Sequence, residues 1–262
     1  MSRTARVTIL GSGTSHGVPM IGCTCPTCTS TDPRDTRTRP SIYLEVPGGP
    51  SLLVDTSSDL RQQALRHRLA RVDAILYTHC HADHVFGLDD VRRFNLLQGS
   101  AIPCFADAQT LADLRRTFWY VFDGLARVGG GIPKLDLKEI EGPFDVGGVH
   151  VVPVPVFHGP RLILGFRFGR FAYLTDCSRI PDTSAALLEG LDVLVLDALR
   201  YKPHATHFTV DEAVEAARRL GVRRTLLTHI AHDLRHADTS ARLPPGVELS
   251  YDGLTIEVAI DP

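Results

Sequence analysis

The chain has 262 residues, of which 44% are hydrophobic and 22% are charged, and its formal net charge is -2. This length fits one large α/β domain, and the small net charge excludes a general attraction to nucleic acid or anionic membranes. No apolar run approaches the ~20 residues of a membrane span, and the start of the chain enters a strand-like run without a signal-peptide core. The six cysteines then favour a reducing compartment and metal binding over disulfides, so we expect a cytoplasmic protein.

The first predicted strand, residues 6–10, runs into a glycine-rich segment that reads G-S-G-T-S-H-G. Its glycine spacing differs from that of a dinucleotide-binding loop, and Pro19 follows where a helix would have to continue. We interpret the segment as a loop that flanks the functional site. An ordinary turn at the end of a strand is the alternative.

Three cysteines follow in a C-x-C-x-x-C arrangement, at Cys23, Cys25 and Cys28. Thiolates at this spacing can hold one ion, and a closed set of four protein ligands favours structural zinc. The fourth ligand must come from elsewhere in the chain. Cysteines that are merely reduced are the alternative interpretation.

Residues 32–40 place three arginines, Arg34, Arg37 and Arg39, beside Asp32 and Asp35. Arginine forks suit phosphate groups, but the interleaved acids can neutralise them locally. We therefore expect a solvated loop whose charges pair with one another.

The next elements lead to the centre of the chain. A hairpin is expected from strands at 41–46 and 51–54, and Ser58 is expected to cap a helix that reaches about residue 69. Leu60, Ala64 and Leu65 would form the inner face of this helix. A strand at 74–77 follows and leads into the most informative motif of the sequence.

That motif reads T-H-C-H-A-D-H and contains His79, His81, Asp83 and His84. In a semi-extended turn, side chains two residues apart face the same way, so His79 and His81 can converge on one ion. Asp83 and His84 lie further along and could reach a second. Imidazole and carboxylate together suit zinc, manganese, iron or nickel rather than calcium.

The rest of the chain alternates helices and strands. We expect helices at 89–97, 107–122, 182–188 and 210–220, strands at 102–105, 135–137, 149–156, 162–168, 171–174, 193–196 and 225–228, and a closing hairpin within 247–258. The helix at 210–220 starts with a capping box formed by Thr209 and Glu212. The aromatic stripe at 118–122 precedes glycines 129–131 and is predicted to be core, with a lid or a dimer contact as the alternative.

Three further potential ligands follow apolar strands: His158, Asp176 and His229. Strands placed side by side would collect them along one rim with the central motif. Seven ligands then make two sites. His79, His81 and His158 would hold one ion, Asp83, His84 and His229 the other, and Asp176 would bridge them. Such ions lie ~3.5–4 Å apart and can share a hydroxide that is available at neutral pH. This is hydrolase chemistry.

The pattern T-H-x-H-x-D-H resembles the signature of the metallo-β-lactamase superfamily. The chain is most similar to its PhnP-type phosphoribosyl cyclic phosphodiesterases, and the likeness covers nearly the whole chain. It includes the glycine-rich opening, C-x-C-x-x-C, H-G-P-R-L-I-L-G-F from His158, T-D at Asp176, and T-H-x-x-H from Thr228.

This resemblance implies an αββα sandwich of two mixed sheets flanked by helices, in a single domain over residues 1–262 with a zinc-binding loop at about 22–40. It implies two manganese or similar divalent ions in the active site and one structural zinc. The zinc ligands would be Cys23, Cys25, Cys28 and His232, with His236 as the competitor for the fourth position.

The resemblance also gives a function. The expected enzyme hydrolyses small cyclic or diester phosphates, similar to phosphoribosyl 1,2-cyclic phosphate, through a metal-bridging hydroxide. His207 occupies the position of the family's general acid, with His204 as its rival, and His207 and Asp83 are the candidate catalytic residues. A small phosphodiester is the expected partner molecule, a homodimer is possible in this family, and neither a membrane nor a nucleic acid is expected.

Three alternatives remain open. Nucleases that process the 3′ end of transfer RNA share the metal ligands, but the chain has no evident basic arm for gripping RNA. Pyrroloquinoline quinone biosynthesis protein B shares the glycine loop and the cysteine spacing without being a phosphodiesterase. A scaffold with purely structural metals is the third.

Four residues inside or beside the metal motifs have supporting roles in this interpretation. Cys80 and Cys177 each neighbour a better ligand, so we expect them to be small buried packing residues. Asp55 and Asp197 end strands, and we expect their carboxylates to orient metal-binding histidines.

Overall fold

Strands dominate the computed structural model, which describes residues 3–124 and 131–261. One sheet of this described part has seven strands: β1 (Thr4–Gly11), β2 (Ser41–Glu45), β3 (Ser51–Val54), β4 (Ala74–Leu76), β5 (Ile102–Ala106), β6 (Leu135–Glu139) and β14 (Thr255–Ala259). They are hydrogen-bonded in the order β14-β1-β2-β3-β4-β5-β6. β1 is antiparallel to its neighbours β14 and β2, whereas β3 to β6 run parallel, so the sheet is mixed.

The second sheet is also mixed and, within the described residues, has seven strands: β7 (Phe144–Val146), β8 (Val149–His158), β9 (Arg161–Phe168), β10 (Phe171–Leu174), β11 (Val193–Asp197), β12 (Arg224–Thr228) and β13 (Val247–Leu249). β7 to β10 pair antiparallel, and β10 to β13 pair parallel. The parallel strands all end at the same edge of the sheet, where their carboxyl ends can present functional side chains.

The two sheets pack face to face over one central core. Successive side chains of a strand point to opposite faces, so each sheet gives one apolar face to this core. Leu44 and Leu76 from the first sheet pack with Phe166, Tyr173 and Val195 from the second, and all five are fully buried. Each such side chain contributes roughly 1.5–3 kcal/mol through its burial.

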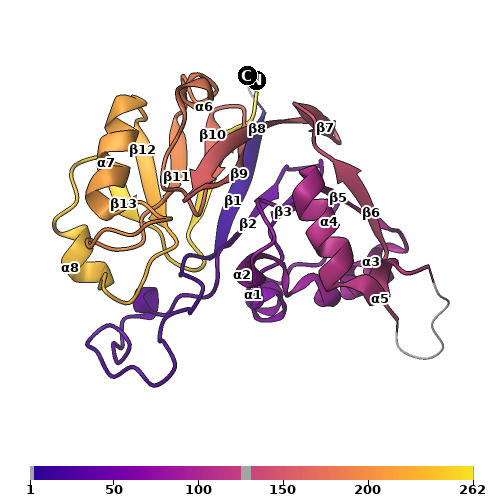
Figure 1. Ribbon diagram of the computed structural model, residues 1–262, viewed down its shortest axis with the longest axis horizontal. Coiled ribbons are helices and arrows are strands. Elements are labelled where there is room, and N and C mark those ends of the chain that lie inside the picture. The colour runs from indigo at the N-terminus through magenta and orange to yellow at the C-terminus, as the bar shows by residue number, and fades with distance from the viewer. Residues whose placement is uncertain (1–2, 125–130, 262) are drawn as a thin grey trace.

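Helices cover the two outer faces and complete the predicted αββα sandwich (Figure 1). The first sheet is covered by α1 (Leu60–His67), α2 (Ala82–Val85), the 3-10 helix η2 (Leu88–Val91), α3 (Arg92–Gln98), α4 (Ala108–Thr117) and α5 (Trp119–Phe122). The second is flanked by α6 (Asp182–Ala186), α7 (Val210–Arg219) and α8 (His236–Ser240). α7 buries Ala213 and Ala216 against this sheet and starts with the predicted capping box.

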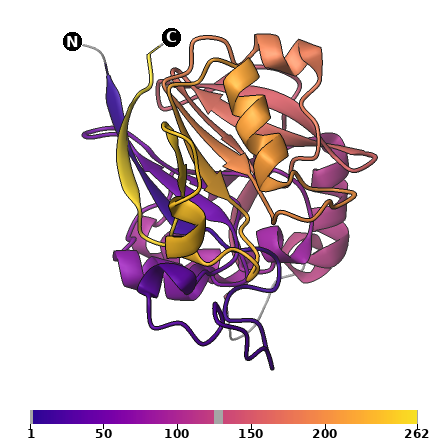
Figure 2. The ribbon, with the colours of Figure 1, turned by 90° about the vertical axis from the view of Figure 1, so that its left-hand side faces the viewer.

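A long loop with little secondary structure separates β1 from β2. It contains the three clustered cysteines and one short 3-10 helix, η1 (Pro33–Asp35). Both views place this indigo loop at the same end of the molecule as α8 (Figures 1 and 2). Segments from opposite ends of the sequence are therefore neighbours here.

Three predicted elements differ from the structure. Residues 107–122 form two helices because Phe118 leaves the helical torsion angles (φ -107°, ψ 41°) and buries its ring in the core beside the first sheet. Residues 247–258 form no hairpin: β13 pairs with β12 in one sheet and β14 with β1 in the other. The alternative of a lid or dimer contact for 118–131 falls partly outside the described residues.

The start of α1 also differs. Asp59 rather than Ser58 precedes the helix, and its carboxylate binds Arg39 instead of capping. Leu65 is 63% exposed, whereas Gln63 is buried because its amide donates to Thr38 Oγ1 and to the Arg39 carbonyl. A polar side chain thus replaces the expected apolar one where the helix holds the long loop.

Candidate metal centre

The segments that carry the predicted ligands come from both sheets and meet at one end of the sandwich. β4 leads into the turn before α2, while β8, β10 and β12 each end at or just before one further candidate. The first of these strands belongs to one sheet and the other three to its partner. The side chains brought together are His79, His81, Asp83, His84, His158, Asp176 and His229.

Backbone conformation marks the same place. Four non-glycine residues of the described part have positive φ, and three of them follow strands at this site: Asp55 at 61°, Asp176 at 54° and His229 at 59°. This conformation costs on the order of 1–3 kcal/mol for a residue with a side chain and persists where the surrounding structure enforces it. The fold therefore turns these three side chains towards the site against their local preference.

One group of ligand atoms is rich in imidazole. His79, His81, His158 and Asp176 each offer an atom within 4.8 Å of the others. His79 Nε2 lies 2.9 Å from His81 Nδ1, and Asp176 Oδ2 lies 3.9 Å from His79 Nε2 and 4.0 Å from His158 Nε2. These are the residues predicted for the first ion, with Asp176 at their edge.

The second group shares Asp176 and adds Asp83, His84 and His229, again within 4.8 Å. His84 Nε2 lies 3.2 Å from Asp176 Oδ1 and 3.4 Å from Asp83 Oδ2, and His229 Nε2 lies 3.5 Å from Asp176 Oδ2. The Nε2 atoms of His84 and His229 are buried without a hydrogen-bond partner. Buried polar atoms are normally satisfied, so two such atoms facing shared carboxylates fit a site built for a cation.

Hydrogen bonds from Nδ1, on the side of the ring that faces away from the site, fix the tautomers of two histidines. His84 donates from Nδ1 to Asp55 Oδ2 at 2.7 Å, which leaves the lone pair of Nε2 directed at the site. His158 donates from Nδ1 to the Thr206 carbonyl at 2.8 Å, with the same effect. Asp55 also accepts from the amide and hydroxyl groups of Thr78, at 2.8 Å each. The expected orienting role of Asp55 is consistent with this geometry, whereas the Thr206 carbonyl leaves no signal in a sequence.

Charge in the site is arranged for a cation. Burial alone would raise the pKa of Asp176, but the charges of His229 and His84 outweigh it and hold this pKa well below its ordinary value. Burial alone would lower the pKa of His229, yet Asp176 and the other nearby carboxylates raise it to about 9. Burial keeps the pKa of His79 well below its ordinary value. The carboxylates thus stay ionised and stabilise positive charge between them, as a divalent ion would supply.

His207 lies against this centre. It is buried, donates from Nδ1 to Asp197 Oδ1 at 3.0 Å, and stacks on His229 with 4.6 Å between the ring centroids. Its ring is 4.8 Å from that of His158. His204, the predicted rival, is exposed and its ring is 5.1 Å from that of His207. Asp197 therefore orients His207 and lies only 3.7 Å from Nδ1 of the ligand candidate His229.

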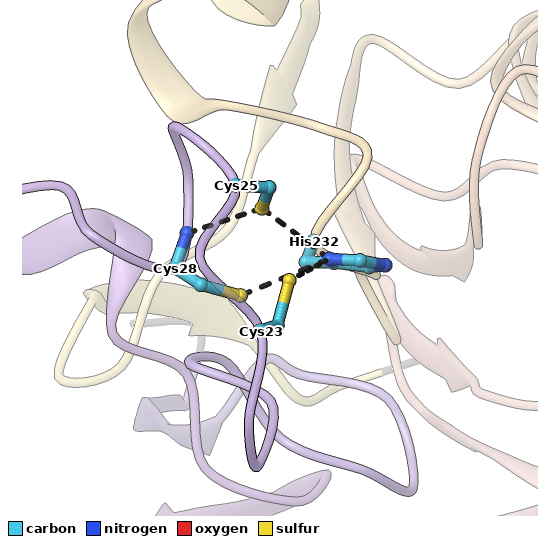
Figure 3. A group of neighbouring side chains, drawn as sticks. All are labelled: Cys23, Cys25, Cys28 and His232. Atoms are coloured by element: carbon cyan, nitrogen blue, oxygen red, sulfur yellow. Dashed lines mark hydrogen bonds between the residues drawn. The ribbon is translucent and has the colours of Figure 1, made fainter.

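The three clustered cysteines meet His232 at a second site (Figure 3). His232 Nδ1 lies 3.3 Å from the sulfur of Cys23, 3.4 Å from that of Cys25 and 3.7 Å from that of Cys28. Zinc bonds of ~2.3 Å to sulfur and ~2.05 Å to nitrogen in a tetrahedron would place these atoms roughly 3.5 Å apart. The Cys28 amide donates to the Cys25 sulfur and lowers the pKa of Cys25 to about 6, which favours the thiolate. The four residues fit a zinc ion.

His236 does not join this cluster. Its amide donates to Asp35 Oδ1 at 2.7 Å, and its ring packs on Tyr251. Asp35 in turn pairs with Arg37 at 3.0 Å. Arg37 is 1% exposed, so the expected solvated loop is wrong at this residue, although the pairing of its charges is right.

Arg37 is buried because it holds a distant segment. Its Nη1 donates to the Ala231 carbonyl at 3.0 Å and its Nη2 to the Leu234 carbonyl at 2.7 Å. These carbonyls flank His232, and His229 lies just before them. The arginine therefore fixes the segment that carries one candidate ligand of each site.

The two cysteines inside the metal motifs differ from each other. Cys177 is fully buried in the core beside α7, in line with a packing role. Cys80 is only half-buried and donates to Asp113 Oδ2 at 3.0 Å, so the packing interpretation is wrong for it. Arg161 contacts the same carboxylate at 3.4 Å. The polar cluster depends on an aspartate from α4, which nothing in the local sequence connects to the motif.

Comparison with known proteins identifies the family. The model of the beta-lactamase superfamily domain matches residues 51–230. A solved structure described as a new diphosphatase from the PhnP family is 45% identical, with a TM-score of 0.93 and full coverage of both chains. This chain belongs to the PhnP family of the beta-lactamase superfamily.

Two other proteins are also similar to this chain. An octanoyltransferase of Porphyromonas gingivalis is 37% identical over 258 residues, and the chain spans only about half, 52%, of that protein. Zn²⁺-bound PqqB from Methylobacterium extorquens has a TM-score of 0.77 at 23% identity, covering 97% of this chain and all of that one, which shows a common fold. In the described part of the chain, no helix combines the length and apolar character needed to cross a membrane.

Proposed function

We propose that this metallo-β-lactamase-fold hydrolase is a binuclear phosphodiesterase acting on small cyclic or diester phosphates. The observation that carries the proposal is the pair of ligand groups that share Asp176 and have His207 at their edge. Manganese, zinc, nickel or iron suits this mixture of imidazole and carboxylate ligands. When bound, two such ions would supply an ionised water at neutral pH and polarise a phosphoryl oxygen.

The protein's own residues orient the histidine rings and provide negative charge. Asp55, the Thr206 carbonyl and Thr78 hold the histidine rings so that their lone pairs face the centre. Asp83 and Asp176 would supply the negative charge that holds the cations. None of these groups is free to protonate a departing oxygen, because each is committed to binding or orientation.

His207 is the proposed general acid. Its Nδ1 donates to Asp197, so its Nε2 is the atom available for proton transfer. Its ring stacks on that of His229 and lies 4.8 Å from that of His158, so it contacts one candidate ligand of each proposed ion. An alkoxide leaving group needs such a proton as the phosphorus–oxygen bond breaks.

Cleavage of a phosphoanhydride is the second candidate, favoured by the 45% identity to the protein described as a diphosphatase. The same groups would serve, since both reactions expel an oxygen from a phosphoryl centre. A phosphate leaving group needs less protonation than an alkoxide, so His207 would matter less.

A substrate screen with added manganese, nickel or zinc tests the proposal. We expect turnover of bis(p-nitrophenyl) phosphate and of small cyclic phosphates, with little activity on β-lactams, thiolesters or phosphate monoesters. Turnover of inorganic diphosphate or nucleoside diphosphates without cyclic phosphates would favour the second candidate. Fast lactam or thiolester cleavage without phosphodiesterase activity would contradict both, and cleavage of transfer-RNA precursors alone would place the chain with the processing nucleases.

A further inference from the structure

Asp113 lies outside the candidate ligand set but contacts two of the segments that carry it. This residue belongs to α4 and is 7% exposed. Its Oδ2 accepts from the thiol of Cys80 at 3.0 Å and from Nη2 of Arg161 at 3.4 Å. Arg161 Nη2 also lies 3.5 Å from the Cys80 sulfur. The three side chains therefore contact one another in a closed triangle.

The two partners of this carboxylate lie next to the histidines proposed for the first ion. Cys80 stands between His79 and His81 in the turn after β4. Arg161 begins β9, three residues after His158. β4 belongs to the first sheet, whereas β8 and β9 belong to the second. One carboxylate thus joins the two segments whose separation decides whether all three histidines can reach the same ion.

His81 depends most on this connection. The ring of His79 has a further contact, because its Nδ1 lies 3.0 Å from the Thr78 hydroxyl. His81 is exposed, and in the part of the chain that the structure describes its ring forms no hydrogen bond to a carboxylate, a hydroxyl or a carbonyl group. The backbone on either side of His81 therefore sets the direction of its ring, and the side chain of Cys80 anchors that backbone on one side.

We propose that Asp113 is a positioning residue for the first of the two ions. By holding Cys80 and Arg161 together, it fixes the separation between the histidine pair after β4 and the histidine that ends β8. The inference rests on the proposed function, because it assigns the residue to one ion of a binuclear centre. A carboxylate suits this role, since hydrogen bonds to a charged acceptor are stronger than those between neutral groups, and burial strengthens them further.

The test measures the affinity of each ion in Asp113→Asn, which keeps the shape of the side chain but removes its charge. Protein from which the active-site ions have been removed is titrated with Mn²⁺ in competition with a chelator. Two ions ~3.5–4 Å apart give a spin-coupled electron paramagnetic resonance signal that a single bound ion lacks. We expect the affinity of one ion to fall about tenfold, as is typical when a group behind the ligands is changed, and that of the other to stay the same.

Two ligand variants show which ion is affected. His81→Ala removes a candidate ligand of the first group, and His229→Ala removes one of the second. Adding Asp113→Asn should weaken the remaining ion about tenfold in His229→Ala and leave it unchanged in His81→Ala, because the two changes in the latter act on the same ion. Equal losses in both backgrounds, or no loss in either, would overturn the assignment.

Cys80→Ser and Cys80→Ala test the same connection without changing Asp113. Serine keeps an O–H donor for the carboxylate and should retain the affinity of the first ion, whereas alanine should reproduce the loss. Asp145→Asn, an exposed change on β7, is the matched control and should alter neither ion. Matching affinities in the two Cys80 variants would overturn the role of Asp113 while the binuclear centre stands. If the wild-type protein binds only one active-site ion, the proposed function fails and this role fails with it.

Discussion

At the scale of single residues, the hydrogen bond from His207 to Asp197 supports the proposed role of His207 as a proton donor rather than a metal ligand. His207→Ala should lower turnover of a diester with an alkyl leaving group by ~10²–10⁴-fold, because no other group in the centre is free to protonate that oxygen. The loss should shrink for p-nitrophenol, which departs readily without a proton. Steady-state rates on the two substrates measure the contrast.

Metal content is the control for this variant. Asp197, His207 and His229 are also close enough together to hold an ion. Retention of both active-site ions by His207→Ala, measured by elemental analysis, agrees with the role of acid. Loss of an ion would make His207 a ligand, and equal rate losses on both substrates would remove it from proton transfer.

His232 and His236 form a natural pair for testing the thiolate site. His232→Ala should release about one zinc per chain and lower the melting temperature, because a structural zinc contributes folding free energy. His236→Ala should keep that zinc, since His236 packs on Tyr251 away from the sulfurs. Elemental analysis and thermal unfolding of both variants decide the matter. Zinc retained in His232→Ala would contradict the assignment.

The residues of the candidate metal centre could be singled out from the sequence because each follows a recognisable strand and belongs to a type with clear ligand chemistry. Arg37 could not, because its burial depends on carbonyls at Ala231 and Leu234, nearly 200 positions away. Asp113 is similar, since its partner Cys80 lies on a different element. Local sequence identifies the chemistry of a side chain but not the distant groups that bury or pair it.

At the scale of elements, a residue that follows β3 forms hydrogen bonds with residues that follow β4. Asp55 follows β3 and binds both Thr78 and His84 beyond β4. Asp55→Asn keeps the shape but weakens the acceptor for the His84 proton, so we expect ~10–100-fold weaker metal binding. Competition with a chelator measures this affinity. Asp136→Asn, an exposed change on β6, is the control, and equal affinities in the two variants would contradict the supporting role.

Element types were mostly predictable from periodicity and turn residues, while pairings were less so. The helix at 210–220 was identified by its capping box, which is a local feature. The two strands of the expected closing hairpin lie in different sheets because each finds a better partner elsewhere, β12 for one and β1 for the other. Proximity in sequence favours a hairpin, but the edges left open by the rest of the fold decide the pairing.

At the scale of the whole molecule, the candidate metal ligands come from both sheets. Ions held between β4 on one sheet and β8, β10 and β12 on the other should stabilise the native state, because binding to the folded protein alone shifts unfolding. We expect chelator-treated protein to melt at a lower temperature and manganese or zinc to restore it. Calorimetry before and after treatment tests this. An unchanged melting temperature with proven metal loss would contradict the coupling.

The four residues of the thiolate site are synthesised at different times. Cys28 and His232 are separated by 204 residues. At a synthesis rate of ~5–20 residues per second, the fourth ligand follows the cysteines by about 10–40 s. During every round of translation the three cysteines are therefore present before their histidine partner. In this interval they can be oxidised or can form an incomplete metal complex. The yield of correctly assembled protein therefore depends on how well that interval is protected, and an oxidised or metal-starved cell would lose new chains before it lost old ones.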